Sequence, residues 1–438
     1  MKKITKKINF EKNRIRKIAR NKKKRKNKKY NPNKNYFLQP IKSSTAKMLR
    51  TKVQKILEKN NFIKKINIES NKAIIRIPKE FCFIRNPEQT LDVLKKINYF
   101  FEKTKIEEIF FDYSECELLG LDASVVTDVI IIDGLKYRKR LNIPVKLNGN
   151  YPKTSSAIQV FITSGLLKHL DISSEIEDPL VERLDPFVKN ESSLDLTNKV
   201  ILYYQKCLQR NGYELSPKGI DKFNNLVGEI IDNLGNHCGK NGDWFVSGHF
   251  AQRENNELGK GTLTFISFGN TIYESLKEPD VSSRIRKKLE AHTKCHKKLF
   301  EIGSWNEEMS WTVFALQYKI SRLNSKKAPD RGTGTIKFIQ NFSILGKTFE
   351  SEKPLMTILS GNTHILFDGT YNLKNKIIRN KEVPVIAFNK ENDLKKRPDK
   401  KAVKLLKNKF PGTIITVEFF VDSRYLKSIK EDKNNEKK

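Results

Sequence analysis

At 438 residues the chain is too long for one ordinary domain, and two or three domains are the expectation. Its 85 Lys and Arg residues outnumber 50 Asp and Glu, so the formal net charge is +35. Five isolated cysteines exclude a disulfide framework, and no apolar run reaches the roughly 18–20 residues that span a bilayer. No apolar segment follows the charged N-terminus, so we expect no signal peptide, no membrane partner and a soluble protein of the cytoplasm.

The composition of the two ends of the chain predicts tails. Residues 1–30 carry sixteen Lys or Arg and a single acid, Glu11. We expect residues 1–43 to form a disordered basic tail that neutralises the phosphates of nucleic acid. The alternative is a solvated tail with no partner. Residues 425–438 are polar and form a second expected tail.

Residues 44–172 alternate between apolar strand patterns and helical patterns, which predicts an α/β domain. Asp122 looks like the N-cap of a helix that carries a valine and isoleucine run. The expected strands cover 73–77, 106–113 and 143–147, and the expected helices cover 45–62, 89–101, a segment after Asp122, and 155–169.

An acidic stretch with two prolines begins near residue 173, and we assign 173–214 to a linker that includes a helix over 194–210. A second α/β segment then covers 215–424. Its expected strands cover 244–252, 262–267, 355–361, 363–368 and 414–420.

The second segment opens with Ser216-Pro217, an N-cap acceptor followed by proline at the first helical position. This helix carries Glu229, Asn233 and His237 at intervals of four residues, so the three side chains share one side. An amide oxygen suits Mg²⁺, and a carboxylate can deprotonate an attacking water or hydroxyl. A solvated helix face is the alternative.

Glycine turns follow this helix in order. They are Phe268-Gly269-Asn270-Thr271 after a strand, Asp330-Arg331-Gly332-Thr333-Gly334-Thr335 before a helix, and Phe410-Pro411-Gly412-Thr413 before the last strand. Glycines at such places let backbone N–H groups approach phosphates.

Residues 215–422 therefore resemble the GHKL ATPase family, which includes gyrase and sensor histidine kinases. The resemblance implies a two-layer α/β sandwich that binds ATP with Mg²⁺. It implies that Glu229 is the catalytic base, Asn233 the Mg²⁺ ligand and His237 a group on the phosphate side. Further nucleotide contacts would come from Ser267, Gly269, Arg331, Gly332, Gly334 and Thr413. Ser267 stands where the family has the aspartate that binds the adenine amino group. This departure leaves open a degenerate, non-catalytic scaffold whose basic tail binds nucleic acid.

Residues 66–172 resemble, less closely, the STAS domain of anti-sigma-factor antagonists. Asp122-Ala123-Ser124-Val125 stands where that family carries its phosphorylated serine, so Ser124 is the candidate phosphoacceptor. Plain N-cap chemistry is the alternative interpretation. The two resemblances together imply an ATP-binding regulatory protein, an ATPase switch or a serine kinase, with a protein partner.

A His292-x-x-Cys295-His296 cluster lies on a lysine-rich helical stretch. Three such ligands within one turn are a weak indication of a zinc site, because no fourth ligand is evident.

Overall fold

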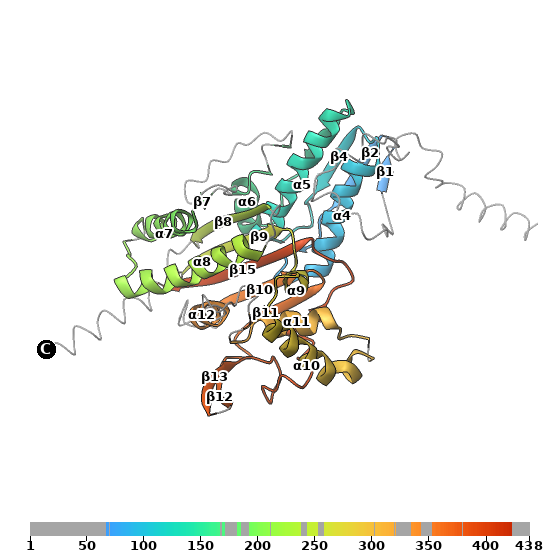
Figure 1. Ribbon diagram of the computed structural model, residues 1–438. Coiled ribbons are helices and arrows are strands. Elements are labelled where there is room, and N and C mark those ends of the chain that lie inside the picture. Colours follow the sequence, from blue (N-terminus) through green and yellow to red (C-terminus); the bar gives the residue numbers. More distant parts are fainter. Residues whose placement is uncertain are drawn as a thin grey trace, which may run out of the picture.

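The computed structural model describes residues 67–69, 71–166, 169–170, 182–184, 192–210, 212–237, 243–252, 258–301, 303–318, 320, 334–342, 353–378 and 380–422. These residues form a mixed α/β structure (Figure 1). Both expected tails and the expected helix over 45–62 lie outside the described residues. Within the described residues, no helix combines the length and the apolar character needed to cross a membrane.

The N-terminal unit is built on a four-stranded sheet with strand order β1-β2-β4-β6. Strands β2, β4 and β6 are parallel, and β1 pairs with β2 in the antiparallel sense. The expected alternation of strand and helix is confirmed here. The elements are β1 (Asn67–Glu69), β2 (Lys72–Arg76), β3 (Glu80–Phe81), α4 (Pro87–Lys103), β4 (Glu108–Asp112), β5 (Leu118–Leu119), α5 (Leu121–Arg140), β6 (Lys146–Gly149) and α6 (Ser155–Thr163).

The start of α5 corrects one prediction. Gly120, in an extended conformation, occupies the N-cap, and Asp122 lies in the first turn of the helix. The Asp122 carboxylate accepts hydrogen bonds from the Ala123 amide and from Thr416 Oγ1. Asp122 therefore links α5 to a distant strand instead of capping the helix.

The C-terminal unit is built on a seven-stranded sheet with strand order β14-β11-β10-β15-β9-β8-β7. Every neighbouring pair is antiparallel. Strand β7 lies inside the expected linker, so that part of the linker belongs to the sheet. The strands are β7 (Glu182–Leu184), β8 (Asp243–Gln252), β9 (Leu258–Phe268), β10 (Leu355–Ser360), β11 (Thr363–Phe367), β14 (Val403–Leu405) and β15 (Gly412–Asp422). A separate hairpin of β12 (Lys374–Ile378) and β13 (Lys381–Val385) extends from its lower side in Figure 1.

Helices cover one face of this sheet and share a hydrophobic core with it. Helix α8 begins at Pro217, and the Ser216 hydroxyl accepts a hydrogen bond from the Gly219 amide, as expected from the sequence. Its apolar residues Phe223, Val227 and Ile230 are buried in this core. The helices of the unit are α7 (Ser193–Gln209), α8 (Pro217–His237), α9 (Ile272–Lys277), α10 (Ser283–Phe300), α11 (Glu307–Ala315) and α12 (Gly334–Phe342).

The N-terminal unit covers the other face of the same sheet. Side chains of β9, β10 and β15, including Ile266, Leu359 and Ile414, belong to the hydrophobic cluster that also contains the cores of α4 and α5. In Figure 1, α4 and α5 lie on one side of the long strands and α11 and α12 on the other. The two units therefore pack as adjacent layers that share a hydrophobic core.

Candidate functional site

Helix α8 presents Glu229 beside α12. Glu229 is half-buried, and this burial raises the pKa of its carboxyl, while the nearby Lys337 cation opposes the rise. Asn233 follows one turn later and is also partly buried. The two side chains therefore belong to a partly dehydrated region of the helix, where a carboxylate is a better proton acceptor than in bulk water.

The first residue of α12 lies against Glu229. A Cβ atom placed on Gly334 would come within 1.9 Å of Glu229 Oε2. Only a residue without a side chain leaves room for the carboxylate in this position. The structure thus brings together Glu229 and Gly334, which lie in separate sequence motifs.

Three hydroxyl side chains meet at one end of the sheet, on the face that carries α8. Ser267 on β9 and Thr413 on β15 are register partners, and Ser360 on β10 is the partner of Thr413 on its other side. The Ser267 hydroxyl donates to the Thr413 carbonyl at 3.5 Å, and Ser360 Oγ lies 2.9 Å from Thr413 Oγ1. Because Phe265 packs with α8 while Ile266 and Phe268 pack with the N-terminal unit, Ser267 faces α8.

The turn after β9 is held by backbone contacts with the turn before β15. The Gly269 amide donates to the Pro411 carbonyl at 3.1 Å. Gly412 has φ +145°, and a Cβ there would lie 1.9 Å from the Ser267 carbonyl oxygen. Thr271 caps α9 in a capping box with Glu274. The two turns therefore form one tightly packed corner.

Three predicted site residues cannot be placed in this corner. Arg331 and Gly332 lie outside the described residues, and only the backbone of His237 is described. The structure thus brings Ser267, Gly269 and Thr413 together at the strand ends, and Glu229 and Gly334 together at the helix pair.

Ser124 lies away from all of them, in the layer between the N-terminal unit and the sheet. Its side chain is fully buried, and its hydroxyl donates to the Gly120 carbonyl at 2.9 Å. In this arrangement a kinase has no access to the hydroxyl. Phosphorylation of Ser124 would require the layers to separate.

The histidine and cysteine cluster of α10 does not form a metal site. His296 accepts from the Trp305 indole and lies 2.7 Å from the Leu394 carbonyl, whereas Cys295 is exposed to solvent. Among the described residues, no group of three His, Cys, Asp or Glu side chains is placed to hold a metal ion. The zinc interpretation is wrong for the described residues.

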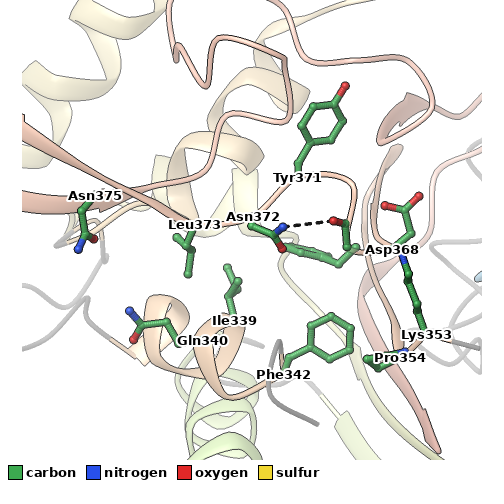
Figure 2. A pocket seen from close by; sticks show the side chains of 12 residues that line it. Ile339, Gln340, Phe342, Lys353, Pro354, Asp368, Tyr371, Asn372, Leu373 and Asn375 are labelled. Atoms are coloured by element: carbon green, nitrogen blue, oxygen red, sulfur yellow. Dashed lines mark hydrogen bonds between the residues drawn. The ribbon is translucent and has the colours of Figure 1, made fainter. Parts of the chain in front are cut away.

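A pocket of about 660 Å³ opens at the opposite ends of β10 and β11. The apolar side chains of Ile339, Phe342 and Leu373 line it, and the Asn372 amide in its wall donates to the Gly369 carbonyl (Figure 2). None of the residues predicted from the sequence lines this pocket, so it is separate from the candidate nucleotide site.

Two further residues belong to the candidate site, although neither was assigned a role in it from the sequence. Ser360 ends β10, and its hydroxyl also accepts from the Ile272 amide at 2.8 Å, which ties α9 to the hydroxyl group. Lys337 is exposed one turn after Gly334, close enough to act on Glu229. The signal for Lys337 was present, because residues three apart on a helix share a face.

No protein-family model, no curated protein and no solved structure matches this chain.

Proposed function

We propose that this protein binds ATP with Mg²⁺ between α8 and α12, in a site of the GHKL type, and acts as an ATP-dependent regulatory protein. The observation that carries the proposal is the contact of Gly334 with Glu229. Two motifs distant in the sequence meet there, as a phosphate site between a polar helix and a glycine turn requires.

The sheet supports the same proposal. Ser267, Thr413 and Ser360 line the helix-covered face at the strand ends, and β8 begins at this end, where Asp243 pairs with Phe268. A base at the strand ends and phosphates at the start of α12 would both lie along α8. In such a site, the base of the nucleotide would contact hydroxyl and backbone groups instead of a carboxylate.

Bound Mg-ATP would supply an activated phosphoryl group. Since the described residues contain no cluster of acidic or histidine ligands, the metal would be held by the Asn233 amide oxygen together with phosphate oxygens. Glu229, whose pKa is raised by burial, would accept the proton of the attacking water or serine hydroxyl. The α12 N-terminus would stabilise the phosphate charge through its free N–H groups.

Lys337 has a role in this proposal. It projects from the same helix, one turn after Gly334, and is exposed. A phosphate at the helix start would lie within reach of its ammonium group, which would then interact with the phosphate and with Glu229.

Calorimetric titration of the full-length protein with Mg-ATP tests the proposal. We expect binding by the natural sequence and at least a tenfold loss in Asn233→Ala, because one oxygen ligand of the metal is removed. Asn225→Ala is the matched control, since it removes the same side chain from an exposed position two turns earlier on α8. Equal loss in both variants, or no heat with ATP, ADP or GTP, would refute the proposal.

A second candidate function follows from Ser267. Its side chain is only 2% exposed and its hydroxyl already donates to Thr413. A site in which this group stays bound to the sheet would reject adenine, and the protein would then be a non-catalytic scaffold. A folded protein that binds no nucleotide, yet shows salt-dependent nucleic-acid binding that disappears when residues 1–35 are deleted, would support this function.

A further inference from the structure

We propose that the solvent-facing side of α10 binds the phosphate backbone of a nucleic-acid duplex. This surface is the basic stripe of α10, formed by Arg284, Lys287, Lys294 and Lys298 with Ala291 between them. It is distinct from the N-terminal tail and from the candidate nucleotide site.

The stripe follows from the helical period. The five residues recur at intervals of three and four, so they lie on one side of the helix, and all five are exposed. With a rise of about 1.5 Å per residue, the stripe is roughly 21 Å long. Within α10 as a whole, seven Lys and Arg stand against one acid, Glu290.

The opposite side of α10 is fixed and uncharged. Ile285, Leu289, His292 and His296 are buried there. Burial lowers the pKa of His292 to about 4 and also lowers that of His296, so both rings are neutral near pH 7. The helix therefore cannot rotate its cations inward, and its positive charge stays on the solvent side.

The four cations of the stripe do not hold any other described part of the chain in place. None of them makes a hydrogen bond or an ion pair there. Arg286 differs, because its guanidinium donates to the carbonyls of Val281, Glu278 and Pro279 and so holds the turn before α10. We therefore exclude Arg286 from the binding surface.

The chemistry of the stripe favours a duplex over other polyanions. It exposes no aromatic side chain on which single-stranded bases would stack. It also exposes no large apolar side chain that would enter a membrane, since the apolar residues of α10 face the core. A straight row of cations beside a small alanine fits a rigid row of phosphates, and the contact is independent of sequence.

Fluorescence anisotropy of a 20-base-pair DNA duplex with the full-length protein tests the inference over a series of salt concentrations. Changing Arg284, Lys287, Lys294 and Lys298 to Glu should weaken binding roughly ten- to a thousandfold at low salt. The slope of log affinity against log salt concentration should also become less negative by about 3–4, since each phosphate contact contributes about 0.9 to the magnitude of that slope. The basic tail is the same in both proteins and does not affect the comparison.

Changing Lys374, Lys381, Lys400 and Lys401 to Glu is the matched control, because these exposed residues change the net charge equally at another place. Equal losses in the two variants would overturn the inference. Cys295 gives a second measurement, because it is exposed beside the stripe while Cys82, Cys116 and Cys207 are buried. Bound duplex should slow the reaction of Cys295 with a thiol reagent, followed on its own peptide.

Reaction of the three buried cysteines would reveal a misfolded variant. Protection of Cys295 by vesicles of phosphatidylserine but not by duplex would assign the stripe to a membrane surface and overturn the inference. Nucleotide binding is not involved in any of these measurements, so failure of the proposed ATP site leaves them unaffected.

Discussion

Asp122 in the first turn of α5 accepts a hydrogen bond from Thr416 on β15, with 3.2 Å between Oδ2 and Oγ1. Thr413, three residues earlier on the same strand, faces the opposite side of the sheet, toward the candidate nucleotide site. One strand therefore contacts the N-terminal unit on one face and carries a site residue on the other. Strand β15 therefore joins the two layers.

Asp122 should make stability depend on pH. Its burial, together with the nearby Glu418, raises the pKa of its carboxyl to about 6. The folded protein therefore holds this proton more tightly than the unfolded chain, and the contribution of Asp122 to the free energy of unfolding falls as pH rises from about 4 to about 6. The size of this loss is on the order of 3 kcal/mol.

Asp122→Asn removes this titration, so its stability relative to the natural protein should increase over that range and stay constant above it. Urea unfolding of both proteins between pH 4.5 and 7.5 measures the difference. Buried His249 and His364, whose pKa values are lowered to about 4, act in the opposite direction but equally in both proteins. Parallel stability curves would contradict the prediction.

The ion pairs of Glu418, whose own side chain is buried, should contribute more to stability than fully exposed pairs. The Glu418 side chain is 4% exposed and contacts Arg85 at 3.3 Å and Lys260 at 2.8 Å. Arg85→Met leaves a buried carboxylate with one partner, and we expect a loss of about 1–3 kcal/mol in unfolding free energy. Lys396→Met, which breaks the exposed pair with Glu391, is the control and should cause no measurable change. A similar effect of both substitutions in urea unfolding would show that burial at Glu418 is unimportant.

Gly334→Ala tests the contact with Glu229 without any assumption about nucleotide. The new methyl group would displace the carboxylate, whose nearest oxygen is 1.9 Å from the ideal Cβ position. Because the end of a glutamate side chain can move, we expect a stability change within about 1 kcal/mol. In a Glu229→Ala background the same substitution should be neutral or stabilising, since the clash is absent and alanine favours a helix.

A double-mutant cycle measured by thermal unfolding gives the coupling between the two positions, which should be about 0.5–2 kcal/mol. Additive effects would mean that the two residues do not touch in solution. If the proposed ATP site is correct, Gly334→Ala alone should also weaken Mg-ATP binding.

Gly412 should tolerate no side chain. Its Cβ would lie 1.9 Å from the backbone oxygen of Ser267, and its φ is +145°. A backbone atom within a sheet cannot move aside, so Gly412→Ala should cost about 3 kcal/mol or more. Gly212→Ala separates the two causes, because Gly212 has φ +73° and open space around it. Gly212→Ala should lower the free energy of unfolding by about 1 kcal/mol, measured by the same urea unfolding series. Equal losses in the two variants would exclude the clash with Ser267 as the cause.

The sequence predicted most elements with strong local signals. Helix α4 and the start of α8 are confirmed, because apolar spacing and Ser216-Pro217 are local features. The expected strand over 143–147 was placed too early, since β6 begins at Lys146, and the expected helix over 155–169 ends earlier, at Thr163. Strand β7 was missed, because three residues at a sheet edge carry no periodic pattern.

The packing of the two units on one sheet was not predicted, although α5 carried a signal for it. Ala123, Val125 and Ile131 are buried on different sides of that helix, and a helix whose apolar residues are not confined to one stripe must be covered on more than one side. The meeting of Glu229 with Gly334 could be expected only from the family resemblance, because a contact between distant segments leaves no mark in either one.

Strand β15 lies between β9 and β10 although it follows both of them in the chain. During synthesis, β9 and β10 each keep an unpaired edge until residues 412–422 have been made and can pair with both strands. Until then the apolar face that receives α5 is incomplete, so neither core can close. Completion of the seven-stranded sheet therefore depends on β15, the last strand to be synthesised. Until β15 has paired, the unpaired edges of β9 and β10 are where off-pathway pairing with other chains would start.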